Sequence, residues 1–218
     1  MTKLSGPMLP PRSGGEPRQV VVLLHGYGSD GSDLIALASH WQDLLPDALF
    51  VSPNGPDATR ENPLGYQWFA LDIERAASRL TNLPGAVPVV VEFLEALWAQ
   101  TGLSAADTVL VGFSQGAMMA LHVGLSLKEP PMGIIAFSGA LVEPEGLADR
   151  QGAKPPVCLV HGALDGVVEP RYSAEAAEKL TALGYLVSHH VSKGVGHSIG
   201  PDGLGFASAF LGGLAATR

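Results

Sequence analysis

The sequence holds a single cysteine among its 218 residues, and the lack of a second thiol excludes any disulfide within the chain. That residue, Cys158, lies in the apolar stretch PPVCLV, a setting more typical of a buried and inert thiol than of a reactive one. No stretch approaches the roughly 18 consecutive apolar residues that a membrane-spanning helix needs. We therefore expect a cytoplasmic protein of a reducing compartment, without stable membrane insertion.

Basic residues are also scarce, with 13 Lys and Arg against 21 Asp and Glu and a net charge of −8. A surface for duplex nucleic acid needs the opposite balance, so we expect no nucleic-acid partner. The first 18 residues lack the unbroken apolar core of a secretory signal, because Gly6, Pro7, Pro10 and Pro11 interrupt it. We expect residues 1–18 to form an irregular arm laid on the domain.

From residue 19 onward, short apolar runs alternate with stretches of helical periodicity. This alternation favours right-handed crossovers and a mostly parallel sheet with helices on both faces, so the expected fold class is α/β in a single domain spanning 19–218. We expect Ser32 to cap the first helix and Gly184 to end the fourth. The expected strands are 19–25, 48–53, 107–112, 132–139, 156–162 and 185–191, and the expected helices are 33–45, 88–100, 115–127, 171–184 and 203–216.

Between residues 54 and 84 the sequence shows neither a short apolar run typical of a strand nor the apolar spacing of a helix. Thirty residues without a long element are uncommon in a compact domain unless they serve a site, so we expect a loop insertion near the active site. Trp68 and Phe69 suggest a lid or a pocket wall, and the alternative is a surface loop pinned by a few aromatic side chains. Exposed apolar residues in this loop or in the last helix leave a homodimer open.

The stretch GFSQG places Ser114 between Gly112 and Gly116, after an apolar run and before a helical pattern. A serine hydroxyl is a poor nucleophile, so it must be exposed, reach a base and lie near oxyanion donors. A sharp strand-to-helix turn meets these needs, and glycine on both sides relieves the crowding of such a turn. We expect Ser114 to be a nucleophile; the alternative is a serine that caps the helix.

A turn of this kind requires an acid and then a base later in the chain. Asp165 follows the expected strand 156–162, and His197 lies in the Gly-rich loop after the expected strand 185–191. Open parallel sheets place their ligands at the carboxyl ends of strands, so both side chains are expected at one rim. Taken alone, Asp165 would equally suit a turn or a helix cap.

The first expected strand runs into LLHGYGSDG, whose glycines free the backbone for close approach to a ligand. We expect the backbone N–H groups of Tyr27 and Gln115 to form an oxyanion hole. His25 precedes the turn at Ser114 and breaks the expected order of acid and base, so we expect it to brace this loop. His161, at a strand end, is expected to hydrogen-bond to the loop that carries Asp165.

A metal site built from His189, His190 and His197 can be imagined. These residues lack the Cys, Asp or i,i+4 spacing that metal sites show, and we expect neither a metal nor a cofactor.

Seven segments together resemble the phospholipase/carboxylesterase group of α/β-hydrolases, which includes acyl-protein thioesterases. The resemblance extends from about residue 20 to 212, and SDGSDLI looks like the bacterial branch. It implies an α/β-hydrolase fold and a cofactor-free enzyme with Ser114 as nucleophile, Asp165 as orienting acid and His197 as base. The segments are LLHGYGSDGSDLI, SPNGP, QWFAL, GFSQGAMMAL, FSGAL, HGALDGVVE and GVGHSI.

The resemblance also implies a small-molecule or lipid substrate, cleaved at a carboxylic ester or thioester. It implies an acyl pocket bordered by the 54–84 loop, with Trp68, Phe69 and Val168 as its residues. The family often has proline directly after its acid, whereas this chain has Gly166.

Several alternatives stay open at this point. A dienelactone-type hydrolase would need cysteine at position 114, and a dehalogenase would need aspartate, so Ser114 excludes both. A serine peptidase on the same fold remains, as does a catalytically silent member that binds a small acidic or acylated ligand. Acyl chain length and the preference between esters and thioesters are not readable from the sequence.

Overall fold

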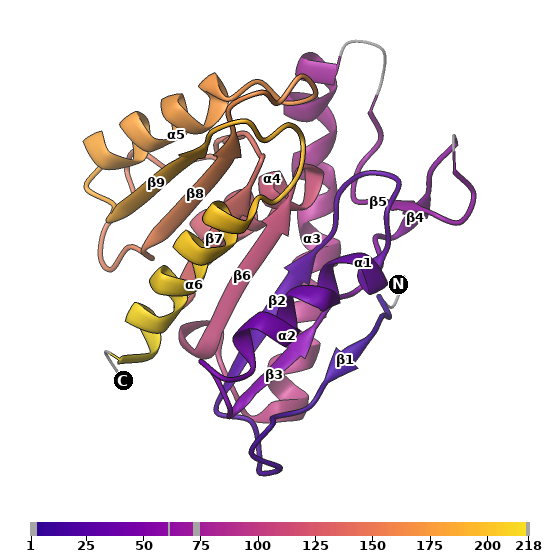
Figure 1. The fold of residues 1–218 in the computed structure, drawn as a ribbon, viewed down its shortest axis with the longest axis vertical. Coiled ribbons are helices and arrows are strands. Elements are labelled where there is room, and N and C mark those ends of the chain that lie inside the picture. The colour runs from indigo at the N-terminus through magenta and orange to yellow at the C-terminus, as the bar shows by residue number, and fades with distance from the viewer. Residues whose placement is uncertain (1–3, 61, 72–74, 217–218) are drawn as a thin grey trace.

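The computed structural model describes residues 4–60, 62–71 and 75–216, and for 75–78 and 80 only the backbone is described. Seven strands form one sheet, in which every neighbouring pair is parallel except β1 and β3 (Figure 1). The prediction of a mostly parallel sheet is thus confirmed. In spatial order the strands are β1 (Met8–Leu9), β3 (Ala48–Val51), β2 (Gln19–Leu24), β6 (Thr108–Phe113), β7 (Gly133–Phe137), β8 (Val157–Gly162) and β9 (Val187–Ser192).

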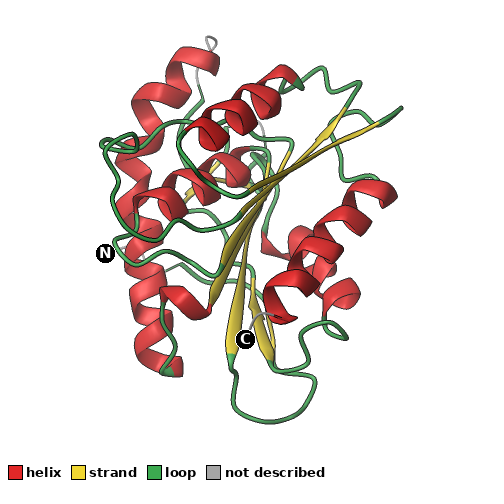
Figure 2. Ribbon diagram, turned by 90° about the vertical axis from the view of Figure 1, so that its left-hand side faces the viewer, coloured by secondary structure: helices red, strands yellow, loops and turns green. Residues whose placement is uncertain are grey.

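Helices cover both faces of this sheet, as the edge-on view in Figure 2 shows. One face carries α3 (Arg75–Thr101), α4 (Gln115–Ser126) and α5 (Arg171–Ala182). The other carries α1 (Gly31–Leu34), the short 3-10 helix Ile35–Leu37, α2 (Ala38–Trp41) and α6 (Pro201–Ala216). A further 3-10 turn, Ala105–Asp107, leads into β6.

The chain changes direction across the sheet at β2. It passes from β2 to β3 on one side and then returns to place β6 on the other side of β2. In open α/β sheets, ligands bind outside the carboxyl ends of the strands at such a switch point. The loops that follow β2 and β6 are therefore where the fold favours a site.

The central strands are apolar on both faces because each face is covered by helices. Their side chains alternate between two cores, so that Val22 and Leu24 face α3 and α4 while Val21 and Leu23 face α1 and α2. Cys158 of β8 is fully buried in the second core, and burial raises the pKa of its thiol to about 12. The prediction of a buried, inert thiol is confirmed.

The structure corrects the predicted helix 33–45. Two single-turn helices joined by a 3-10 turn replace it, and they end at Trp41. The cap is Asp30, not Ser32, because the Asp30 carboxylate accepts hydrogen bonds from the backbone N–H groups of Ser32 and Asp33. The predicted cap at Gly184 is right, since its φ of 79° is a left-handed conformation directly after the end of α5.

The structure also shortens the predicted 54–84 loop, because α3 begins at Arg75 and includes Pro84 and Pro88. Proline costs a helix a backbone hydrogen bond, which is why the sequence indicated a later start. Packing overrides this cost, since Leu83, Val90 and Leu94 bury one stripe of the helix completely. The rest of the segment contains β4 (Asp57–Ala58) and β5 (Tyr66–Gln67), a hairpin at the right of Figure 1.

The predicted irregular arm contains β1, which pairs with β3 through residues 8 and 9. Residues 1–3 of the arm, and 61 and 72–74 of the predicted loop, lie outside the described residues. None of the helices within the described ranges combines the length and apolar character needed to cross a membrane.

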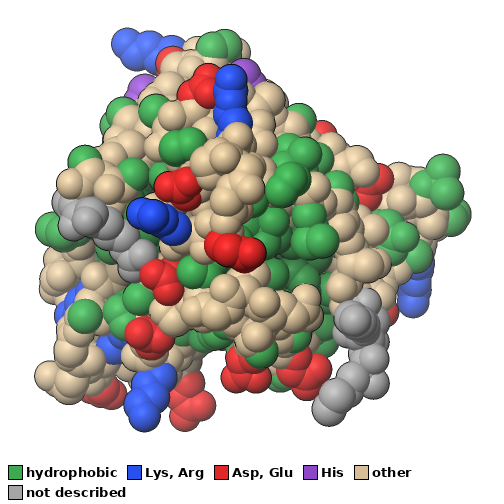
Figure 3. Space-filling model, turned by 90° about the horizontal axis from the view of Figure 1, so that it is seen from below, with side chains coloured by type: hydrophobic (Ala, Val, Ile, Leu, Met, Phe, Trp, Pro, Cys, Tyr) green, Lys and Arg blue, Asp and Glu red, His purple; other side chains and the backbone are tan. Residues whose placement is uncertain are grey.

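The face seen from below, where the parallel strands begin, carries hydrophobic side chains near its middle (Figure 3). Acidic and basic side chains are intermixed around them, so this face does not present a field of one sign.

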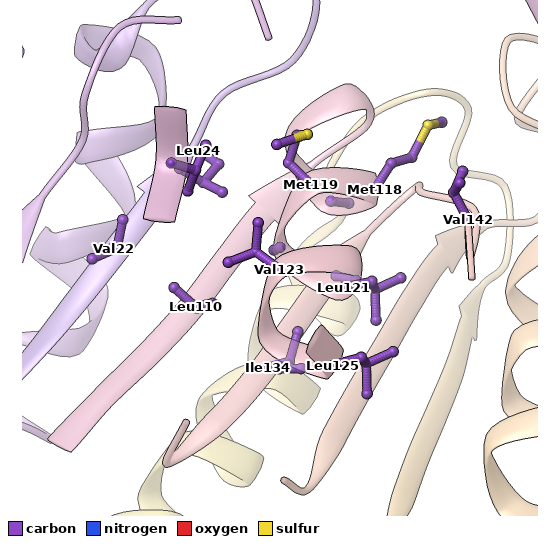
Figure 4. Packing of buried hydrophobic residues seen from close by; sticks show 14 of the residues in the cluster. Val22, Leu24, Leu110, Met118, Met119, Leu121, Val123, Leu125, Ile134 and Val142 are labelled. Atoms are coloured by element: carbon purple, nitrogen blue, oxygen red, sulfur yellow. The ribbon is translucent and has the colours of Figure 1, made fainter. Parts of the chain in front are cut away.

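Helix α4 packs closely on the middle of the sheet, and its apolar side chains lie over those of β2, β6 and β7 (Figure 4). Its first turn approaches the strand ends so closely that only glycine fits there. A Cβ atom added to Gly116 would lie 1.9 Å from the carbonyl oxygen of Leu24, and one added to Gly112 would lie 2.2 Å from that of Gly116. The predicted reason for both glycines is confirmed.

We predict that Gly116→Ala lowers the free energy of unfolding by about 2 kcal/mol or more, because backbone atoms must move to admit the methyl group. Gly213→Ala in α6 is the matched control. A Cβ there meets no atom within 4 Å, so this change should raise stability by about 0.5–1 kcal/mol. Urea unfolding of both variants measures the difference, and equal stability of the two would contradict the close approach.

Candidate active site

Ser114 occupies the turn between β6 and α4. Its backbone is left-handed, with φ of 53°, and its N–H donates to the carbonyl of Phe137 on the neighbouring strand at 2.9 Å. A non-glycine residue in this region stores strain, which persists because the surrounding close packing enforces it. This conformation places the Ser114 hydroxyl at the carboxyl end of the sheet, where the side chain lines a pocket.

His197 bridges Ser114 and Asp165. Its Nε2 lies 3.0 Å from Ser114 Oγ, and its Nδ1 lies 2.7 Å from Asp165 Oδ2. Asp165 follows β8 and His197 follows β9, the next strand in the sheet, so adjacent strand ends bring the pair together. All three residues that the sequence singled out therefore form one continuous hydrogen-bonded chain.

The Asp165 carboxylate is completely buried and accepts hydrogen bonds at both oxygens. Oδ2 accepts from His197, and Oδ1 accepts from the backbone N–H groups of Val167 and Val168, each at 2.9 Å. Burial alone would raise the pKa of Asp165, but the hydrogen bonds from His197, Val168 and Val167 outweigh it and lower the pKa below its ordinary value of 3.8. An ionised Asp165 accepts from Nδ1–H of His197 and so leaves Nε2 to accept from Ser114.

His161 holds the loop that carries Asp165, as the sequence predicted. Its buried Nε2 donates to the carbonyl of Val168 at 2.8 Å and lies 3.3 Å from Asp165 Oδ2. This contact holds the loop at Val168, two residues after Gly166, which stands where the family often has proline. Burial lowers the pKa of His161 below 6.5, so its imidazole is neutral at neutral pH.

His25 braces the loop after β2, also as predicted. It is fully buried; its Nδ1 donates to the carbonyl of Gly26 at 2.7 Å, and its Nε2 accepts from the N–H of Gly55 at 2.9 Å. This pattern requires a neutral ring, and burial accordingly lowers the pKa of His25. The braced loop puts Tyr27 in the lining of the same pocket as Ser114 and Gln115.

The pocket above Ser114 has a volume of about 180 Å³. Of the three residues expected in an acyl pocket, Val168 is among those that line this pocket, whereas Trp68 and Phe69 are buried and are not among them. The lining residues are Tyr27, Leu71, Arg79, Ser114, Gln115, Met118, Val167, Val168 and His197.

The two aromatic residues instead fix neighbouring backbone. The Gln115 side chain accepts from Trp68 N–H at 2.9 Å and donates to the Phe69 carbonyl at 2.7 Å. Trp68 Nε1 donates to the carbonyl of His25 at 2.8 Å. The aromatic residues of this segment do lie close to the site. Their positions are set by the hydrogen bonds of the Trp68 indole and of the Gln115 side chain.

Four of the lining residues were not predicted from the sequence, Leu71, Arg79, Met118 and Val167, and Arg79 is the charged one among them. It is only 8% exposed and stands four residues before Leu83, on the buried stripe of α3 that continues through Val90 and Leu94. A basic residue at a position with the spacing of apolar helix residues could have indicated a buried cation. Because residues 54–84 were predicted to form a loop, this helical spacing was not recognised.

The three histidines considered for a metal have separate partners. His189 Nε2 lies 3.1 Å from Ser173 Oγ, His190 Nε2 lies 2.8 Å from Asp202 Oδ2, and His197 bridges Ser114 and Asp165. In the part of the chain that the structure describes, no three His, Cys, Asp or Glu side chains are grouped as metal ligands would be.

The family model for phospholipase/carboxylesterase matches residues 12–214 of the chain. Among curated relatives, esterase YpfH of Escherichia coli is 30% identical over 193 residues, which cover 87% of this chain and 80% of that protein. Acyl-protein thioesterase 1 of Gibberella zeae is 27% identical over 209 residues and covers 88% of each protein.

Solved structures show the same likeness. The crystal structure of esterase PE8 has a TM-score of 0.93 and 56% identity, over 97% of this chain and 99% of that one. A phospholipase/carboxylesterase from Dyadobacter fermentans has a TM-score of 0.69 and 26% identity, over 97% and 98% of the two chains.

We predict that the protein loses stability as the pH falls below 6.5. Burial lowers the pKa of His25, His122, His161 and His189 below the ordinary 6.5, so the unfolded chain takes up protons at a higher pH than the folded chain does. Their contribution is fully present above pH 6.5 and is lost as the pH falls towards the lowered values. Urea unfolding should give a free energy about 1 kcal/mol or more lower at pH 5.0 than at pH 7.5. Equal or greater stability at pH 5.0, with an unchanged m-value, would contradict the neutral buried imidazoles.

Proposed function

The chain belongs to the phospholipase/carboxylesterase family of α/β-hydrolases, and on that premise we propose that it is a serine esterase that works through an acyl-enzyme on Ser114. The observation that carries the proposal is the hydrogen-bonded chain from Ser114 Oγ through His197 to Asp165, with distances of 3.0 and 2.7 Å. The scissile bond is a carboxylic ester or a thioester, since both react through the same intermediate.

The first step is attack of Ser114 Oγ on the acyl carbonyl carbon. Nε2 of His197 accepts the hydroxyl proton as the new C–O bond forms. Buried Asp165 holds Nδ1–H, which keeps the required tautomer, and its negative charge stabilises the imidazolium that forms. The low pKa of Asp165 supports this role, because the carboxylate stays ionised throughout.

The negative charge that develops on the carbonyl oxygen needs donors. We assign the backbone N–H groups of Tyr27 and Gln115, whose residues line the pocket beside Ser114. Gln115 is the first residue of α4, a helix of 12 residues, and the positive end of its dipole faces the same point. Each donor of this kind contributes about 3–4 kcal/mol to lowering the barrier.

The tetrahedral intermediate then breaks its bond to the leaving group. His197 gives its proton to the leaving atom, which is oxygen for an ester and sulfur for a thioester. Water enters, His197 removes a proton from it, and the resulting attack releases the carboxylic acid and restores Ser114. The serine and histidine each return to their starting state, so no cofactor takes part in the cycle.

The pocket favours a small acyl group. Its volume of about 180 Å³ is below the roughly 300–1,000 Å³ usual for drug-sized ligands. The apolar side chains of Leu71, Met118 and Val168 in its wall suit a short aliphatic chain.

We predict that Ser114→Ala lowers kcat/KM for 4-nitrophenyl butyrate by about a thousandfold or more, because the variant cannot form the acyl-enzyme. Ser126→Ala, at the other end of the same helix, is the matched control and should keep the wild-type rate. Circular dichroism and urea unfolding show that both variants are folded. Hydrolysis by the Ser114 variant at the wild-type rate would refute the nucleophile, and a wild-type protein inactive on all esters and thioesters would refute the function.

A further inference from the structure

One part of the pocket wall belongs to a segment without regular secondary structure. Leu71 lines the pocket above Ser114, and residues 68–71 lie between β5 and α3. Such a segment has no helix or ladder of its own, so its position depends on hydrogen bonds to other elements. Met118 and Val168 line the same pocket, and the position of Leu71 relative to them therefore limits the acyl group that fits.

The side chain of Gln115 holds this segment against the start of α4. Its Oε1 accepts a hydrogen bond from the backbone N–H of Trp68 at 2.9 Å, and its Nε2 donates to the carbonyl of Phe69 at 2.7 Å. Gln115 is only 1% exposed, so the loss of either partner would leave a buried polar group unpaired. The oxygen and the nitrogen of this amide are thus committed to two consecutive residues of the segment.

Two further hydrogen bonds hold the same stretch. Asn82 on α3 donates from Nδ2 to the carbonyl of Ala70 at 2.9 Å, and Trp68 Nε1 donates to the carbonyl of His25 at 2.8 Å. Three consecutive residues are therefore bound to α4, to α3 and to the loop after β2. Gln115 lines the pocket itself, whereas Asn82 and Trp68 are not among the lining residues.

Gln115 also links the segment to a second part of the wall. It stands three residues before Met118 on α4, and residues at this spacing are neighbours on one helix face. The amide therefore places the segment of Leu71 beside the face of α4 that carries Met118 into the pocket. The start of α4 is itself held on the sheet, because Gly116 packs closely against the carbonyl of Leu24.

We propose that the Gln115 side chain determines the length of the acyl group that the enzyme accepts, by holding Leu71 at the pocket wall, with Asn82 as a second anchor. A held wall contacts a short aliphatic chain and stops a longer one. This role is separate from that of the Gln115 backbone N–H, which a change of side chain leaves in place. Gln115 is in this respect a positioning residue. The inference rests on the proposed function and adds the origin of its acyl selectivity.

The test compares kcat/KM for the 4-nitrophenyl esters of butyric and hexanoic acid, after subtraction of the rate without enzyme. The wild-type protein should favour butyrate at least about tenfold, because a held wall leaves no room for two more methylene groups. Gln115→Met keeps the length of the side chain and removes the amide. This variant should lower the butyrate-to-hexanoate ratio at least about fivefold, whereas a general loss of activity or stability would slow both esters alike.

Gln67→Met is the matched control. It is the same substitution directly before the segment, but Gln67 Nε2 donates to the carbonyl of Ala58 at 3.3 Å, within the hairpin of β4 and β5. The control should keep the wild-type ratio. Asn82→Ala removes the second anchor and should lower the ratio in the same direction as Gln115→Met.

A double-mutant cycle measures whether Gln115 acts through Leu71. Leu71→Ala shortens the wall directly and should lower the ratio by itself. Gln115→Met added to Leu71→Ala should change the ratio by less than about twofold, because the side chain that the amide positions is already gone. Effects that multiply in full in the double variant would overturn the route through Leu71.

A wild-type ratio near one would overturn the proposal, and so would a folded Gln115→Met variant that keeps the wild-type ratio. If Gln115→Met does not fold, Asn82→Ala takes its place, and a wild-type ratio in that variant overturns the proposal. Hydrolysis that depends on Ser114 but proceeds equally on both esters would refute the role of the wall alone. The absence of hydrolysis for every ester and thioester would refute the proposed function itself.

Discussion

The arrangement of the site depends on the close approach of the first turn of α4 to the ends of β2 and β6. Gly116 lies against the carbonyl of Leu24, and Gly112 lies against Gly116. This contact forces Ser114 into its left-handed conformation and directs its side chain into the pocket. It also makes Gln115 the first residue of a helix, where its N–H points out of the helix end and its side chain ties down the loop beside it.

Around this fixed point, neutral histidines hold the loops in place. His25 fixes the loop that carries Tyr27, and His161 fixes the loop that carries Asp165. Protonation of either imidazole would place a positive charge in a buried site. Burial therefore lowers the pKa of both His25 and His161, and the neutral rings keep their hydrogen bonds to the loops. Donors and acceptors held in place in this way around Ser114 suit the proposed acyl transfer, because they need little rearrangement as charge develops.

The sequence predicted most strands of the main sheet well, because buried parallel strands are continuous apolar runs. It also singled out Ser114, Asp165 and His197, which lie together in the structure because each stands in the loop after one of these strands. It misplaced the start of α3, where tertiary packing of Leu83 and Val90 outweighs the local cost of Pro84 and Pro88. Because of that error Arg79 was assigned to a loop, although it belongs to α3 and is buried on the same stripe as Leu83. The buried position of Trp68 could not be predicted from the sequence either. It depends on hydrogen bonds to His25 and Gln115, which are distant in the chain.

Reactivity of Ser114 towards a fluorophosphonate probe tests the account most directly, because only a serine activated by a neighbouring base attacks phosphorus. The folded protein should take up one label per chain at neutral pH, and mass spectrometry of its peptides should place that label on Ser114. Labelling should disappear after unfolding in urea, when His197 no longer lies 3.0 Å from the hydroxyl. A folded protein that takes up no label, or takes it up at another residue, would contradict the central claim.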